Sequence, residues 1–118
     1  MAVFDATMTL RGYADQWGEV AFGPGQDGAC SDANAALGVE DGSAVCLGGE
    51  GGYLIVSFAG VDCIAEGDLI QTFELGTEAE PYDLLVGPTA SATDVNWVAC
   101  ASGASGPTQC TVPALPQL

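Results

Sequence analysis

Short apolar runs alternate with clusters of Gly, Pro, Asp and Ser along the whole chain. The runs are rich in Val, Ile, Tyr and Phe and alternate loosely with polar positions, which is typical of half-buried β-strands. The segments predicted as strands are residues 3–10, 18–22, 44–47, 53–58, 69–73, 82–86, 95–100 and 110–115. Residues 34–37 predict one helical turn, with Ser31 or Asp32 as its cap.

About eight short strands separated by turn signals predict an all-β fold, a single jelly-roll-like β-sandwich of antiparallel strands. The length of 118 residues fits one domain over residues 1–118. Pro113 and Pro116 restrict residues 113–118 to an edge or a tail. Residues 1–12 contain the first strand, and we expect this strand to be available for pairing with a neighbouring sheet edge during assembly.

The charge balance narrows the classes of partner. The chain has 16 acidic residues, one cation (Arg11), no Lys and no His, and its net charge is -15. Phosphate binding depends on Lys and Arg, so nucleic acid and anionic membranes are excluded as partners. No apolar run approaches the ~20 residues of a membrane helix, and no signal peptide is predicted. Without His or Lys, few nucleophile–base pairs are available, so we expect no enzymatic activity.

Five cysteines in a small domain without His predict disulfides and secretion rather than a zinc site. Cys100 and Cys110 flank a stretch of Gly, Ser and Pro that predicts a hairpin loop, so they are expected to meet across paired strands. Cys30 and Cys46 close the next loop. Cys63 remains, either as a buried thiol, the interpretation we favour, or as a link between subunits.

Several short motifs follow one another in order over residues 13–100. They are Tyr13-Ala14-Asp15-Gln16, the stretch from Asp32 to Ser43, Leu47-Gly48-Gly49, Leu54-Ile55-Val56-Ser57-Phe58, the stretch from Asp68 to Gly76, the stretch from Glu80 to Val86, and Trp97-Val98. In this order the chain resembles a family of bacterial cell-surface β-sandwich domains related to discoidin-type, galactose-binding-like modules. The resemblance implies a sandwich fold and a binding role at a cell surface.

Acidic loops provide the candidate metal site. Asp32, Asn34 and Asp41 belong to one loop, and the resemblance implies that Asp68 and Glu74 lie beside it. Calcium takes ~6–8 oxygen ligands of this kind. We therefore predict a stabilising calcium ion at these residues. The alternative is that Asp32 and Asp41 only shape turns through bonds to nearby backbone groups.

Aromatic residues provide the candidate ligand surface. Aromatic rings in strands are more often core residues than stacking platforms, and we expect this of Trp97. Trp17, near Gly12 and Gly18, and Tyr53 are the candidates for ligand binding.

Two functions compete on these grounds. The first is a secreted, calcium-stabilised, non-enzymatic adhesion or binding module at the cell surface that recognises a glycan or a surface protein. The alternative is a structural subunit of an extracellular fibre or surface layer, a homo-oligomer or polymer built by strand pairing. The odd cysteine and the absence of Lys favour this alternative. A decoration protein of a virus particle is a third hypothesis.

Overall fold

The computed structural model describes residues 1–26, 28, 30–39, 41–61, 63–73, 81–89 and 91–115. Within these residues the chain forms only short strands and one 3-10 turn. They are β1 (Ala2–Phe4), β2 (Leu10–Tyr13), β3 (Gln16–Ala21), η1 (Ala33–Ala36), β4 (Tyr53–Ser57), β5 (Leu69–Gln71), β6 (Tyr82–Val86), β7 (Val98–Ala104) and β8 (Gln109–Thr111). The all-β prediction with eight short antiparallel strands is confirmed.

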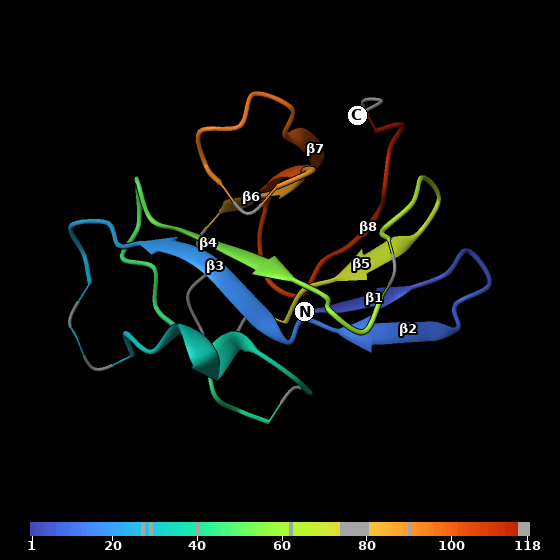
Figure 1. The fold of residues 1–118 in the computed structure, drawn as a ribbon. Helices are drawn as coiled ribbons and strands as arrows, with labels where there is room; N and C mark the ends of the chain where they lie inside the picture. Colours follow the sequence, from blue (N-terminus) through green and yellow to red (C-terminus); the bar gives the residue numbers. More distant parts are fainter. Residues whose placement is uncertain are drawn as a thin grey trace.

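The described strands form three small sheets and not one closed sandwich or jelly roll. The first sheet has four strands in the order β2-β1-β5-β8, and the other two are the separate hairpins β3–β4 and β6–β7. Figure 1 shows the four-stranded sheet on the right, β3–β4 with η1 below it on the left, and β6–β7 above. The predicted sandwich therefore appears as three sheets that share a core but are not joined edge to edge.

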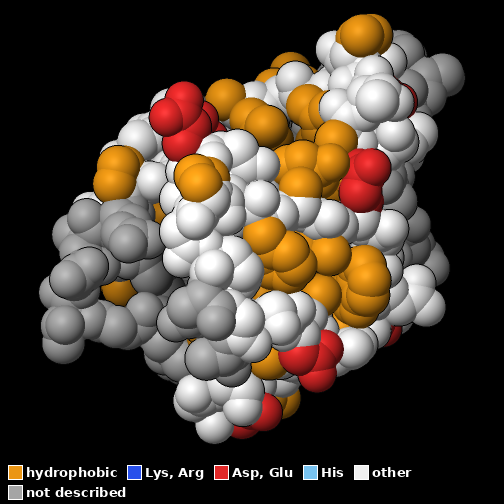
Figure 2. All heavy atoms as spheres, turned by 90° about the vertical axis from the view of Figure 1, so that its left-hand side faces the viewer, with side chains coloured by type: hydrophobic (Ala, Val, Ile, Leu, Met, Phe, Trp, Pro, Cys, Tyr) orange, Lys and Arg blue, Asp and Glu red, His pale blue; other side chains and the backbone are white. Residues whose placement is uncertain are grey.

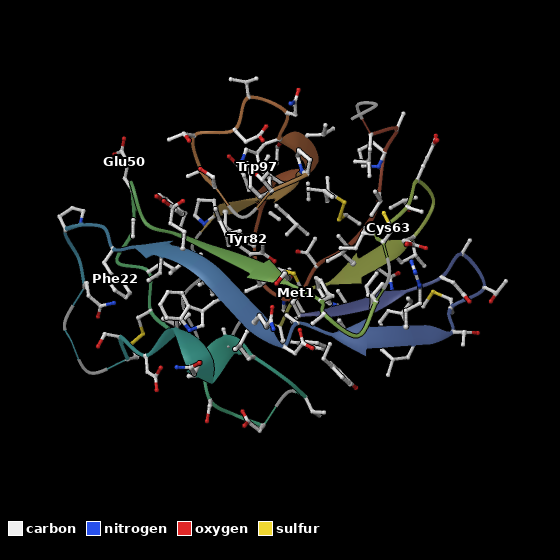
Figure 3. All side chains as sticks on the ribbon, viewed as in Figure 1. Met1, Phe22, Glu50, Cys63, Tyr82 and Trp97 are labelled. Carbon is white, nitrogen blue, oxygen red and sulfur yellow. A yellow bond between two sulfur atoms is a disulfide. The ribbon has the colours of Figure 1, made fainter. Side chains whose placement is uncertain are left out.

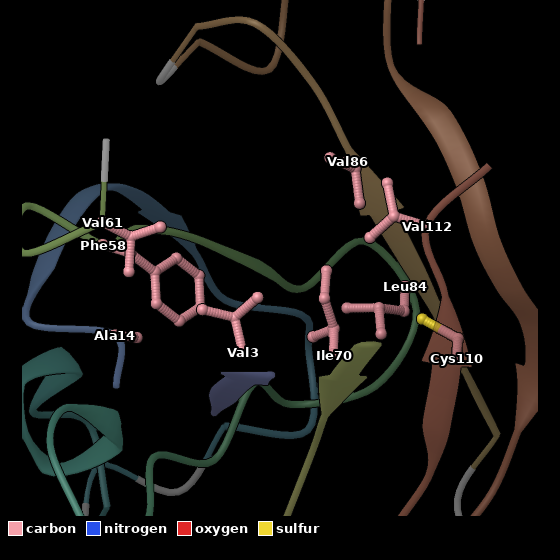
Figure 4. Packing of buried hydrophobic residues seen from close by; sticks show 9 residues of the cluster. All are labelled: Val3, Ala14, Phe58, Val61, Ile70, Leu84, Val86, Cys110 and Val112. Carbon is pink, nitrogen blue, oxygen red and sulfur yellow. The ribbon is translucent and has the colours of Figure 1, made fainter. Parts of the chain in front are cut away.

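The core lies between the four-stranded sheet and β6. Val3, Ile70 and Cys110 stand directly opposite one another on β1, β5 and β8, and so present one apolar row to the interior. Leu84 and Val86 point to the same cluster from β6, because alternate residues of a strand share a face. The remaining members of the cluster, seen in Figure 4, are Ala14, Phe58, Val61 and Val112.

The predicted strand 3–10 is in fact two strands joined by a turn. The Asp5 carboxylate accepts bonds from the Thr7 hydroxyl at 2.6 Å and from the Thr9 amide at 3.0 Å, and Met8 adopts a φ of 67°. The Thr7 hydroxyl is the main cause that holds the pKa of Asp5 below its ordinary value of 3.8, followed by the Thr9 amide. Because this pKa is lowered by folding, the associated stability is present above about pH 4 and is lost as the pH falls further.

The turn changes the role expected for the first strand. β1 pairs with β2 on one edge and with β5 on the other, and Val3 is fully buried. A strand with both edges paired has no free backbone groups to offer a neighbouring molecule. Any pairing through residues 1–12 therefore has to use the outer edge of β2.

Other predicted elements differ in smaller ways. The helical turn is confirmed, shifted to Ala33–Ala36, with Asp32 as its cap. Residues 44–47 form no strand, since their contacts are with the loop that follows β3: Gly23 donates to Leu47, and Cys46 donates to Cys30. The strand predicted at 95–100 begins later, at Val98.

Close packing of two loop segments yields a stability prediction. A Cβ on Gly23 would lie 2.5 Å from the Gly48 carbonyl oxygen and 2.7 Å from that of Glu50, closer than real atoms approach. We expect Gly23→Ala to lower the free energy of unfolding by roughly 1–3 kcal/mol, because the backbone has to move to admit the methyl group. Gly60→Ala is the matched control, because a Cβ there has nothing within 4 Å and the backbone needs no left-handed φ. Equal denaturant midpoints for the two variants would contradict this packing.

Candidate binding groove

The predicted calcium ligands Asp32 and Asn34 are bonded to their own neighbourhood. The Asp32 carboxylate accepts two bonds of 2.9 Å from Asn34, one from the backbone amide and one from the side-chain amide. The Asn34 side-chain oxygen in turn accepts a bond of 3.2 Å from the indole N–H of Trp17. These bonds form the cap of η1 and tie this turn to β3.

The other predicted ligands are not gathered around this loop. Asp41 accepts a turn bond of 2.9 Å from the Ser43 amide. Asp68 is buried, forms an ion pair with Arg11, and accepts a bond of 2.8 Å from the Ala65 amide. Glu74 lies outside the described residues. Among the described part of the chain, no three His, Cys, Asp or Glu side chains are close enough together to hold a metal ion.

Calcium binding stays a prediction from sequence, and it can be separated from simple charge screening. A net charge of -15 opposes compaction, so any salt raises stability to some extent. The prediction is that Ca²⁺ raises the melting temperature by several degrees more than Mg²⁺ at equal ionic strength, because a specific ligand of the folded state adds stability. Identical shifts with the two ions, measured by calorimetry, would refute it.

The cysteine pairing is confirmed for both predicted bridges. Cys30–Cys46 has a Cα separation of 5.2 Å and Cys100–Cys110 one of 5.8 Å. The second bridge does not cross a hairpin, however, because β7 pairs with β6 while β8 pairs with β5. It therefore fastens the β6–β7 hairpin to the four-stranded sheet. Two disulfides indicate an oxidising, extracellular environment.

Cys63 is an exposed thiol, so its interpretation as a buried thiol is wrong. It lies in the loop between β4 and β5 (Figure 3), where its sulfur makes a 3.7 Å contact with the Ile64 carbonyl oxygen. The loop turns this side chain outward while Val61 and, in part, Ile64 pack on the core. A link between subunits stays a prediction.

The two predicted ligand aromatics do not form one platform. Both are exposed, Trp17 by 40% and Tyr53 by 36%. Trp17 stands opposite Val56 in the β3–β4 ladder, and Tyr53 is three residues from Val56 on β4. Since side chains alternate along a strand, Trp17 and Tyr53 project from opposite faces of this hairpin. Tyr53 alone borders the groove described next.

An open apolar groove, which the sequence did not predict, lies between β4 and β6. Every residue from Tyr53 to Phe58 and from Pro81 to Val86 lines it, together with Trp97, whose ring lies against Gly87. Consecutive side chains of a strand point to opposite faces, so a groove lined by all of them follows the strand's edge. Of the described residues, β3 contributes none to the lining and β7 only Gly103. The groove therefore runs along the edges of β4 and β6 that carry no partner strand.

The molecule exposes more surface to water than its mass predicts. Its radius of gyration of 13.7 Å is close to the ~13.5 Å expected for this chain length. Its accessible surface of 6866 Å² nevertheless exceeds the roughly 5,900 Å² expected for this mass. The fold is thus ordinary in extent but leaves more surface open to water than a fully packed domain does.

The groove is acidic as well as apolar. Glu50 and Asp83 line it, and no Lys, Arg or His side chain of the described residues does. The Asp83 carboxylate also accepts a bond of 2.9 Å from the Gly103 amide of β7. Arg11, the single cation of the chain, is paired with Asp68 in the four-stranded sheet. Figure 2 shows a broad apolar patch on one face of the molecule with carboxylates at its margin, and Figure 3 places Glu50 at the end of the β3–β4 hairpin. Glu19 accepts a bond of 2.8 Å from the Ala92 amide, which ties the loop after β6 to β3.

No family model, curated protein or solved structure matches this chain. The resemblance to discoidin-type, galactose-binding-like modules therefore stays a prediction. Among the described residues, no helix has the length and apolar character needed to cross a membrane.

Proposed function

We propose that this protein is a secreted, non-enzymatic binding module of a cell surface, and that it holds its partner in the groove between β4 and β6. The observation that supports this most directly is the apolar groove bordered by edges of β4 and β6 that pair with no described strand. Folded monomers rarely leave apolar surface of this kind exposed unless it binds something. The two disulfides suit an extracellular module, and the predicted calcium ion is a separate part of the proposal.

A structural subunit of a fibre or surface layer is the second candidate. One observation favours it: β2 and β8 are the outer strands of the four-stranded sheet, and both hairpins also have open edges. Open edges pair readily with other chains. The charge of -15 on every copy opposes such assembly unless cations screen it.

Light scattering after size-exclusion chromatography separates the two candidates. A binding module is expected to stay monomeric at micromolar concentration, with or without calcium. It is also expected to retain glycans or peptides presented on arrays. High-mass polymers without array binding would reject the binding module and favour the structural subunit.

A further inference from the structure

We infer that the groove takes an extended polypeptide segment of another protein, one that alternates apolar residues with Lys or Arg and adds a strand between β4 and β6. This inference rests on the proposed function and specifies the partner's chemistry. It draws on three features of the groove: its unpaired strand edges, its apolar lining and its charge.

The strand edges select an extended backbone as the occupant. Among the described strands, β4 has a ladder only with β3 and β6 only with β7. Each therefore presents N–H and C=O groups on its other edge, which is the edge that borders the groove. An added strand satisfies such groups with main-chain hydrogen bonds, whereas a sugar or a helix offers no row of free backbone groups to match a strand edge.

The lining selects alternate apolar side chains. Leu84 and Val86 reach the core from β6, while Leu85 is 48% exposed and Tyr53 of β4 is 36% exposed. Exposed apolar groups along both strands gain free energy when a partner's side chains cover them. In an added strand every second residue meets this surface, so the partner needs apolar residues at alternate positions only.

The charge selects a basic partner over a second copy of this chain. Glu50 and Asp83 line the groove with no Lys, Arg or His side chain among the described lining residues, and each copy of the protein carries a charge of -15. A second copy would bring like charge to this surface, whereas Lys or Arg on the outward positions of an added strand would meet opposite charge. The inference therefore commits to a different, cationic protein segment.

The test measures binding of labelled peptides to the intact, oxidised protein by fluorescence anisotropy. The probe is a peptide of about ten residues that alternates valine with lysine. One control carries glutamate for each lysine, and another carries N-methyl groups on alternate backbone amides, which blocks strand pairing. We expect micromolar binding of the probe and at least about tenfold weaker binding of both controls.

Two protein variants remove the same charge at different places. Glu50 lines the groove, whereas Glu66 is exposed outside it. Glu50→Gln is expected to weaken probe binding roughly twofold to fivefold and Glu66→Gln to leave it unchanged. Equal effects of the two variants, equal binding of the N-methylated peptide, or no peptide binding would overturn the inference. If the peptides did not bind but glycans bound on the array, the inference would fail while the proposed function stood. High-mass polymers without any array binding would reject both.

Discussion

Replacing Cys100 and Cys110 together by Ala is expected to destabilise the protein by roughly 3–5 kcal/mol. Closing a loop with a sequence separation of 10 contributes about 2–3 kcal/mol in the chain-entropy account. Cys110 also belongs to the buried core, and the bridge fastens the β6–β7 hairpin to the four-stranded sheet. The loss corresponds to a fall of roughly 10–20 °C in melting temperature.

Cys63→Ala is the matched control for the double variant. Cys63 is exposed and forms no disulfide, so its replacement is expected to change stability by less than about 0.5 kcal/mol. Calorimetry of the two proteins under oxidising conditions gives the comparison. If the double variant had the same melting temperature as Cys63→Ala, the bridge would not hold the hairpin in place.

Ile70→Ala is expected to lower the free energy of unfolding by roughly 2–5 kcal/mol, which is the second of the two largest effects predicted. Ile70 is 2% exposed and stands at the centre of the row that Val3 and Cys110 complete across the sheet. Truncation leaves a cavity between strands held on both sides, so the surroundings have little freedom to collapse into it.

Two further variants calibrate this loss. Ile70→Val removes one methyl group and is expected to cost about 0.5–1.5 kcal/mol. Val95→Ala, at a side chain that is 92% exposed, is expected to cost almost nothing. Urea unfolding of the three variants measures the order, and a loss at Ile70 no greater than at Val95 would contradict the core described above.

The strand that the sequence predicts best is β6, for local reasons. Tyr82, Leu84 and Val86 alternate with less buried positions, Pro81 precedes them and Gly87-Pro88 ends the run. All of this information lies within the strand itself, so the predicted bounds are those observed. The pairing of Cys30 with Cys46 is likewise local, because the two residues close one loop.

Tertiary pairing explains what the sequence did not predict. The turn at residues 5–9 depends on Asp5, Thr7 and the left-handed Met8 and contains neither Gly nor Pro, so a single Asp is its only turn signal. Residues 44–47 have strand composition but are bonded to a distant loop instead of a neighbouring strand. Which sheet each strand joins depends on contacts between segments far apart in the chain. The prediction of a single sandwich could not include these contacts, and the strands form three sheets instead.

The sequence predicted one residue of the candidate site, Tyr53, but not the site itself. Tyr53 does border the groove, whereas Trp17 projects from the other face of β3–β4 because the ladder sets it opposite Val56. Asp68 was expected to bind calcium, but Arg11 reaches it across the sheet, a contact between residues 57 positions apart. The groove itself had no signal in the sequence, since it depends on edges that stay unpaired.

Amide hydrogen exchange of β4 and β6, measured with and without the valine–lysine peptide, tests the central claim most directly. In the free protein, the amides that do not donate to β3 or β7 are expected to exchange rapidly, because no strand covers them. Addition of the peptide is expected to slow these amides and to leave β1 and β5 unchanged. Amides of β4 and β6 that are already protected in the free protein, or that stay fast when the peptide is bound, would contradict the claim that these edges are the binding site.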